Sequence, residues 1–292
     1  MPPPDPCPPI GANTWIWVSP LTDDDLAVLA PRLAGWGFDV VEMPIEDPGD
    51  WDPGRTADLL AGLGLGATVC AVMPPGRELV ATTPDVVATT QDYLSRCIDA
   101  AARVGATVVG GPVYASVGRT WRFGPDERAR YAAELREALA SVADHAAAQG
   151  VRLGLEPLNR YETSVVNTVE QGLEMIDGLP PEGIGLTLDT YHLNIEERDP
   201  AAAVRLAGAA GRLAHVQVCA NDRGAPGADH MDWPGLRAAL ADVGYGGPLC
   251  IESFTADNAS IATAASIWRP LARSQDAIAT DGLAFLRHLW RG

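Results

Sequence analysis

Acidic residues stand at the ends of short apolar runs at three places in the sequence. Glu156 ends the run VRLGLE, Asp189 ends IGLTLD, and Glu252 ends PLCIE. Because Pro157 cannot donate a ladder hydrogen bond, a buried strand should end at Glu156. A buried carboxylate is costly without a positive partner, so each acid alone predicts either an ion pair with an arginine or a metal ligand.

A fourth apolar run, RLAHVQV, adds His215 and Gln217 to this set. Three carboxylates that converge on one point repel one another strongly unless a cation lies among them. A set of oxygen ligands with at most one nitrogen ligand favours Mg²⁺, Mn²⁺ or Co²⁺ over a structural zinc ion. An ion pair is the simpler interpretation for any one of these residues. Polar residues on four apolar runs together predict a divalent metal site.

Buried strands alternating with longer amphipathic segments must position these residues. We expect strands at 11–17, 38–43, 66–72, 106–110, 151–156, 184–189, 212–218 and 248–252. Eight strand–helix pairs predict one α/β domain, a (β/α)8 TIM barrel over residues 11–292, after a proline-rich arm at 1–10. Active sites of such barrels lie at the carboxyl ends of the strands, where the run-ending residues would gather.

Local start and stop signals place the helices. Thr22 precedes three aspartates that suit a helix N-terminus, and Gly105 and Gly150 follow the last turns of two other helices. The expected helices are 22–35, 54–63, 84–104, 125–149, 168–178, 199–209, 233–243 and 262–290.

Composition excludes several classes of partner. A net charge of −17 argues against nucleic acid and anionic membranes as partners. The segment MPPPDPCPPIG is not a signal peptide, and there is no apolar run of membrane-spanning length. The five cysteines lack metal-site spacing and predict free buried thiols in a reducing, cytoplasmic environment.

The motifs around these residues are similar to those of a known family. The segments LEPLNRYET, LTLDTYHLNIEE, NDRGAPG, IESF and GGPVYASVG resemble those of ketose 3-epimerases of the D-tagatose/D-allulose type, within the xylose isomerase-like barrel superfamily. They are spread over most of residues 11–255, so the resemblance covers nearly the whole predicted barrel.

This resemblance implies a divalent metal ion, Mn²⁺ first with Mg²⁺ or Co²⁺ as alternatives, held by Glu156, Asp189, a strand-seven residue and Glu252. It implies that Glu156 and Glu252 are also the acid–base pair. It implies that Glu162, His192 and Arg223 bind the hydroxyls at the reacting end of a sugar, in a homo-oligomer that is a dimer or tetramer. His192 could instead cap or pack, and Arg223 could pair with a loop acid, Asp222 or Asp229.

The strand-seven position departs from the family. The epimerases have a histidine six residues before the arginine, and here that position is Gln217, with His215 one pleat deeper on the same face. A neutral amide oxygen can coordinate a hard cation, so we predict Gln217, rather than His215, as the fourth ligand. A glutamine there resembles the hydroxypyruvate isomerase branch of the superfamily.

The expected reaction is epimerisation of a free ketose at C3 through an enediolate, with one glutamate removing a proton and the other returning it on the opposite face. A hydroxypyruvate- or inosose-type isomerase is the first alternative. An AP endonuclease is disfavoured by the charge and by only five histidines, and an inactive sugar-binding barrel would be expected to lack a ligand. Four aromatic residues could form an apolar wall for the distal sugar carbons or be core: Trp15, Trp17, Tyr114 and Trp121.

Overall fold

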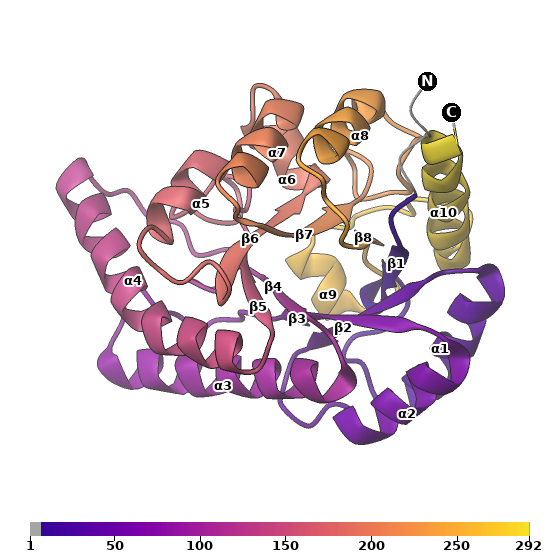
Figure 1. The fold of residues 1–292 in the computed structure, drawn as a ribbon, viewed down its shortest axis with the longest axis horizontal. Helices are drawn as coiled ribbons and strands as arrows, with labels where there is room; N and C mark the ends of the chain where they lie inside the picture. The colour runs from indigo at the N-terminus through magenta and orange to yellow at the C-terminus, as the bar shows by residue number, and fades with distance from the viewer. Residues whose placement is uncertain (1–6, 292) are drawn as a thin grey trace.

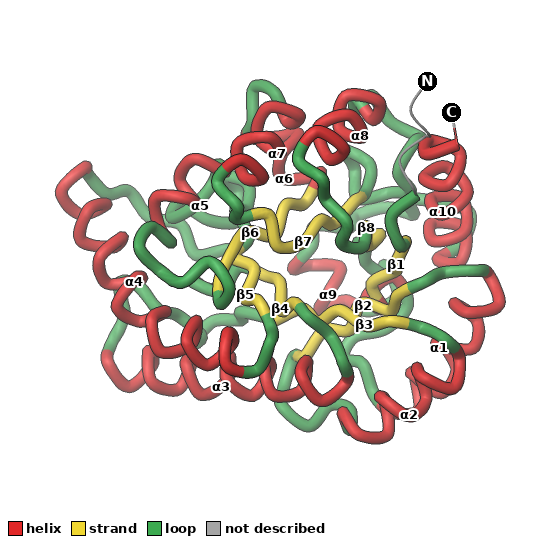
Figure 2. The backbone as a smooth tube through the Cα atoms, in the orientation of Figure 1, coloured by secondary structure: helices red, strands yellow, loops and turns green. Residues whose placement is uncertain are grey.

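A computed structural model describes residues 7–291, without the side chain at position 260, and its centre is a closed ring of parallel strands. Figure 2 shows the ring in yellow, inside the helices in red. Each strand pairs with the next along the chain, and β8 closes the ring on β1. The strands are β1 (Ile10–Asn13), β2 (Val40–Ile45), β3 (Gly66–Ala71), β4 (Val108–Gly111), β5 (Arg152–Leu155), β6 (Ile184–Asp189), β7 (Leu213–Val218) and β8 (Leu249–Ile251).

Helices cover the outside of this ring (Figure 1). They are α1 (Asp23–Trp36), α2 (Pro53–Leu63), α3 (Pro84–Val104), α4 (Pro125–Ala148), α5 (Val169–Met175), α6 (Thr190–Glu196), α7 (Pro200–Ala209), α8 (Trp233–Asp242), α9 (Ala259–Ala264) and α10 (Gln275–Arg291), with a 3-10 turn η1 (Thr14–Ile16). The structure therefore confirms the predicted (β/α)8 barrel. No helix within the described range 7–291 is both long and apolar enough to cross a membrane.

Two predicted boundaries were wrong for identifiable reasons, and one helix was missed. The single helix expected at 262–290 is two helices, α9 and α10, with Pro270 in the irregular segment between them. The first strand ends at Asn13 rather than at residue 17, because the Asn13 side chain accepts a hydrogen bond from the backbone of Trp15 and starts η1. The short helix α6, which begins directly after Asp189, was not expected. Of the predicted arm, residues 1–6 lie outside the described part of the chain, and Ile10 already belongs to β1.

The predicted helix signals act as expected. Thr22 and Asp25 form a capping box at the start of α1, each side chain bonding the other's backbone N–H. Gly105 and Gly150, which follow α3 and α4, adopt positive φ angles of 81° and 68°, a conformation that other residues rarely adopt.

The interior of the ring combines close packing with polar groups. A β-carbon at Gly154 would lie 2.2 Å from Oγ1 of Thr187, so only glycine on β5 leaves room for this threonine on β6. At the carboxyl end of the ring, a small apolar cluster packs Ala262 of α9 with Trp15 and Phe254. The segment after β8 therefore covers the strand ends, and Figure 1 shows α9 across the centre of the ring.

Candidate active site

The three predicted carboxylate ligands lie at the carboxyl ends of their strands. Asp189 is the last residue of β6, and Glu156 and Glu252 each follow the last residue of β5 and β8. All three are buried, with at most 5% of their surface exposed. Oxygens of Glu156 and Asp189 and a ring nitrogen of His192 lie within 4.8 Å of one another. The strand ends thus bring together acids that lie up to 96 residues apart (252 − 156) in the sequence.

Gln217 lies at the level of these acids, whereas His215 lies below them. Gln217 pairs in register with Asp189 on β6, and its Nε2 donates a hydrogen bond to Oε1 of Glu252 at 2.7 Å. His215 stands one pleat deeper, where its Nε2 contacts Oε2 of Glu42 at 2.5 Å. Of these two residues of β7, Gln217 is the one that contacts a predicted carboxylate ligand, and His215 contacts Glu42 instead.

Arg223 reaches back over the strand ends from the loop after β7. Its Nη1 donates to Oδ2 of Asp189 and, at 2.9 Å, to Oε2 of Glu252. Its Nη2 lies 3.2 Å from Nε2 of His192. The backbone of Arg223 has a φ of 70°, unusual for a residue with a β-carbon, and its carbonyl oxygen accepts a hydrogen bond from Ser253 at 2.5 Å. The loop geometry thus directs this arginine inward, and it does not pair with a loop acid.

His192 and Glu162, the other predicted sugar-binding residues, are joined by Asn159. The backbone N–H of Asn159 donates to Nδ1 of His192 at 3.0 Å, and its side-chain amide donates to Oε1 of Glu162 at 2.7 Å. Burial, and then the positive charge of Arg223, lowers the pKa of His192 to about 4, so this imidazole is neutral near pH 7. Asn159, which the sequence analysis did not single out, therefore holds two predicted site residues in place.

Burial disfavours the charged form of the acids at this site. Burial raises the pKa of Glu156 well above its usual range, and the neighbouring Glu252 and Asp189 raise it further. Burial raises the pKa of Glu252 as well, although Arg223 partly offsets this shift. One guanidinium thus faces three carboxylates, and the remaining negative charge would be offset by a cation.

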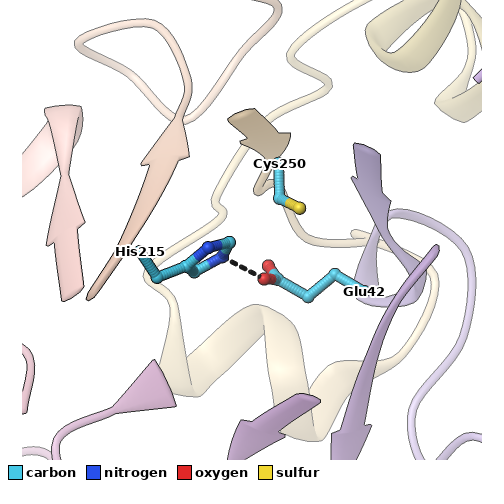
Figure 3. A group of neighbouring side chains, drawn as sticks. All are labelled: Glu42, His215 and Cys250. Atoms are coloured by element: carbon cyan, nitrogen blue, oxygen red, sulfur yellow. Dashed lines mark hydrogen bonds and ion pairs between the residues drawn. The ribbon is translucent and has the colours of Figure 1, made fainter. Parts of the chain in front are cut away.

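Glu42 is a buried acid that the sequence analysis missed. It lies within the apolar strand β2 and is 0% exposed. Figure 3 shows its carboxylate facing the imidazole of His215, with Cys250 nearby. Burial alone would raise the pKa of Glu42, but the charge and hydrogen bond of His215, with hydrogen bonds from Gln217 and Asn13, lower it to about 2. An acid in the middle of an apolar strand was the only signal in the sequence.

One of the four candidate aromatic residues contacts the site. Trp15 packs against Phe254 with 5.4 Å between ring centroids, and the guanidinium of Arg223 lies 5.1 Å from the Phe254 ring. Trp17 donates its indole N–H to Asp276, outside the ring. The other two candidates are Tyr114, which is fully buried, and Trp121, which packs on the aromatic residues Phe123 and Tyr131.

The donor set is suited to a hard divalent cation. It offers three carboxylates and the Oε1 of Gln217, which is buried without a hydrogen-bond partner among the described residues. An orphaned buried oxygen is unfavourable unless it meets a donor or a cation. The thiol of Cys219 lies 3.6 Å from Oδ1 of Asp189, but burial raises its pKa well above the usual range, which disfavours the thiolate form that binds metals.

Known proteins of this architecture have similar sequences along nearly the whole chain. A probable ketose 3-epimerase of Synechocystis sp. is 32% identical over 281 residues, which cover 96% of each chain. An L-ribulose 3-epimerase of Mesorhizobium japonicum is 32% identical over 95% of this chain and 92% of its own. A solved structure of an L-ribulose 3-epimerase superposes with a TM-score of 0.87 at 32% identity, covering 97% of this chain and 94% of that one.

A D-allulose 3-epimerase from Methylomonas sp., solved in complex with D-allulose, superposes with a TM-score of 0.85 at 29% identity, covering 97% of this chain and 98% of that chain. The sequence model of the xylose isomerase-like TIM barrel family matches residues 31–289. This chain is a member of the xylose isomerase-like TIM barrel family, and its relatives include ketose 3-epimerases.

Proposed function

We propose that this protein is a metal-dependent ketose 3-epimerase that interconverts free ketoses at C3 through an enediolate. The observation that carries the proposal is the gathering of Glu156, Asp189, Gln217 and Glu252 at one end of a barrel whose relatives are named ketose 3-epimerases. The acids come from strands β5, β6 and β8, so they surround one point instead of lying side by side on one element.

These four residues are the proposed metal ligands. Their oxygens favour a hard divalent ion, and we propose Mn²⁺, with Mg²⁺ or Co²⁺ as alternatives. When bound, such an ion supplies positive charge that stabilises negative charge developing on the oxygens of the ketose. It would also offset the carboxylate repulsion that raises the pKa of Glu156 and Glu252.

Glu156 and Glu252 are the proposed proton carriers. They follow strands β5 and β8, which lie three positions apart around the ring, so they approach a bound sugar from different sides. One glutamate, as the carboxylate, removes the C3 proton to give an enediolate, and the other, as the carboxylic acid, delivers a proton to the opposite face. The glutamate that donates its proton in one direction is left as a carboxylate, so it can act as the base in the reverse direction. This exchange of roles suits a reversible epimerisation.

The remaining polar residues would hold the sugar. Arg223 and the neutral His192 lie 3.2 Å apart beside the carboxylates, where they can bind hydroxyl oxygens at the reacting end. Oε1 of Glu162 accepts a hydrogen bond from Asn159, and the carboxylate can accept another hydrogen bond from a sugar hydroxyl. Phe254, packed on Trp15, offers an apolar surface beside Arg223 for the distal carbons. We also propose a homo-oligomer, a dimer or tetramer, as the family resemblance implies, and a cytoplasmic location, as the pattern of cysteines predicts.

Isotope exchange tests the proposal directly. The protein is incubated with Mn²⁺ and a panel of free ketoses in D₂O, and the products are examined by NMR. Deuterium at C3 with inversion supports an epimerase. Deuterium at C1 or C2 would refute it and support the hydroxypyruvate- or inosose-type isomerase, which the glutamine at position 217 favours.

Two isosteric variants test the acid–base assignment. Glu156→Gln and Glu252→Gln should each lower turnover by several orders of magnitude, roughly, because a proton carrier and a ligand charge are lost together. Circular dichroism should show an unchanged fold. Retention of most activity in either variant would show that the pair is wrongly assigned.

A further inference from the structure

The amide of Gln217 has an orientation fixed by its neighbours. Its Nε2 donates to Oε1 of Glu42 at 2.9 Å and to Oε1 of Glu252 at 2.7 Å. An amide nitrogen carries two protons, and these two carboxylate oxygens are its nearest acceptors, with Sγ of Cys70 a third neighbour at 3.4 Å. The Oε1 of Gln217 therefore faces neither acid, and it is the buried amide atom that has no partner among residues 7–291.

The reverse orientation is electrostatically excluded. Rotating the amide by 180° would place Oε1 of Gln217 at hydrogen-bond distance from Oε1 of Glu42, an oxygen that already accepts a hydrogen bond from Asn13, so two acceptors would face each other. Two buried acceptors that face each other without a donor are unfavourable. Glu42 thus selects which atom of the Gln217 amide is left to meet a cation.

Glu42 is the rigid partner of the two. Its Oε1 accepts from Asn13 at 3.1 Å as well as from Gln217, and its Oε2 accepts from Thr68 at 3.1 Å and contacts His215 at 2.5 Å. Because both oxygens are held, and the side chain is fully buried, the carboxylate cannot rotate without breaking several hydrogen bonds at once.

We propose that Glu42 is a positioning residue, which holds the amide of Gln217 in the orientation that presents Oε1 to the divalent cation. The inference rests on the proposed metal site. It assigns a role to a side chain that is not itself a ligand. In many metal sites a carboxylate similarly accepts a hydrogen bond from a histidine ligand and so fixes its orientation.

A second metal site at Glu42 is the competing interpretation, because Glu42, His215 and Cys250 offer ligand atoms within 4.8 Å of one another. Figure 3 shows that the imidazole already points at the carboxylate. With four hydrogen-bonding neighbours on its two oxygens, Glu42 has no lone pair left facing an open position. The geometry therefore favours positioning over direct coordination.

Metal affinity tests the proposal without relying on turnover. Mn²⁺ binding to the purified full chain is titrated by calorimetry and by the EPR signal of free Mn²⁺. Glu42→Gln keeps the shape of the side chain but loses one acceptor oxygen, and it should weaken binding about 10–100-fold. Thr68→Val is the matched control, because it removes a donor to Oε2 of Glu42 and leaves Gln217 untouched, so its affinity should match that of the wild type.

A double-mutant cycle identifies the route of the effect. In a Gln217→Met background, which already lacks the amide, Glu42→Gln should cause no further loss of affinity. If Glu42→Gln does not fold, Glu42→Asp keeps the charge but withdraws the oxygen from Gln217, and it should show the same loss.

The outcomes separate this inference from the proposed function. Suppose that the wild type binds one equivalent of Mn²⁺. If Glu42→Gln binds Mn²⁺ equally well, or if the losses of affinity in the double-mutant cycle are additive, then Glu42 does not act through Gln217. The proposed metal site would still stand. If the wild type binds two equivalents of Mn²⁺ and Glu42→Gln binds one, Glu42 is a ligand of a second metal site instead. No binding in the wild type would overturn the metal site and the positioning role together.

Discussion

Glu156→Gln should make the metal-free protein more stable while it abolishes turnover. Among the described residues, the Glu156 carboxylate has one polar contact, Nε2 of His192 at 3.5 Å, so the substitution removes a charge and little else. Oxygens of Glu156 and Asp189 lie within 4.8 Å of each other, and two charges at that distance repel by about 3 kcal/mol at an effective dielectric constant of about 20. Because Arg223 already offsets part of the Asp189 charge, we expect a net gain of about 1–3 kcal/mol.

The gain should depend on pH with a definite sign. The pKa of Glu156 in the folded protein is raised above its usual value of 4.5, so the folded state binds this proton more tightly than the unfolded state does. The wild type therefore has its full stability from this group below pH 4.5 and loses it as the pH rises toward the folded-state pKa. A glutamine does not titrate, so the advantage of the variant should grow with pH from about 5 to 8.

Thermal unfolding in EDTA at several pH values is the measurement. The midpoint of Glu156→Gln should exceed that of the wild type by roughly 2–8 °C at pH 8, and the difference should shrink toward pH 5. Adding Mn²⁺ should reverse the order, because the wild type keeps the full ligand set. A variant that is less stable than the wild type at pH 8 without metal, or a difference that does not vary with pH, would refute the electrostatic reasoning.

Glu162, His192 and Arg223 are the predicted sugar-binding residues. Replacing any one of them with alanine should raise KM for the ketose and leave Mn²⁺ affinity largely unchanged. Loss of Mn²⁺ from any of them, measured by equilibrium dialysis, would mean that the residue is a ligand. Gln217→Leu should release Mn²⁺, whereas Gln217→His should retain metal and favour Co²⁺ or Zn²⁺, as elemental analysis of dialysed protein would show. His215→Gln should mainly lower the unfolding midpoint, and loss of metal there with retention in Gln217→Leu would reverse the ligand assignment.

Positions governed by a local rule were predictable from the sequence. Buried parallel strands appear as short apolar runs, and an acid at the end of such a run has a defined place in a barrel. Asp189 and Glu252 were located in this way, and the spacing to Arg223 located Gln217. The break between α9 and α10 was missed because apolar residues recur on both sides of Pro270, which hid the end of the first helix.

The inward path of Arg223 had no comparable signal. Nothing in the letters NDRG requires a positive φ at an arginine, which the loop imposes through Ser253 and the turn back to Ala220. The ion pairs with Asp189 and Glu252 depend on that one backbone conformation. Its position at the site was expected from the family resemblance alone.

Glu42 and Glu156 show why the chemistry of a buried acid cannot be inferred from its own neighbours in sequence. Both are buried in the same barrel, yet the pKa of Glu42 is lowered to about 2 while that of Glu156 is raised. Glu42 is surrounded by hydrogen-bonding groups from three other strands, whereas Glu156 faces two carboxylates and one imidazole at 3.5 Å. The ring closure alone brings those groups together, and it leaves one acid as a fixed anion that can hold Gln217 and the other as an acid that can carry a proton.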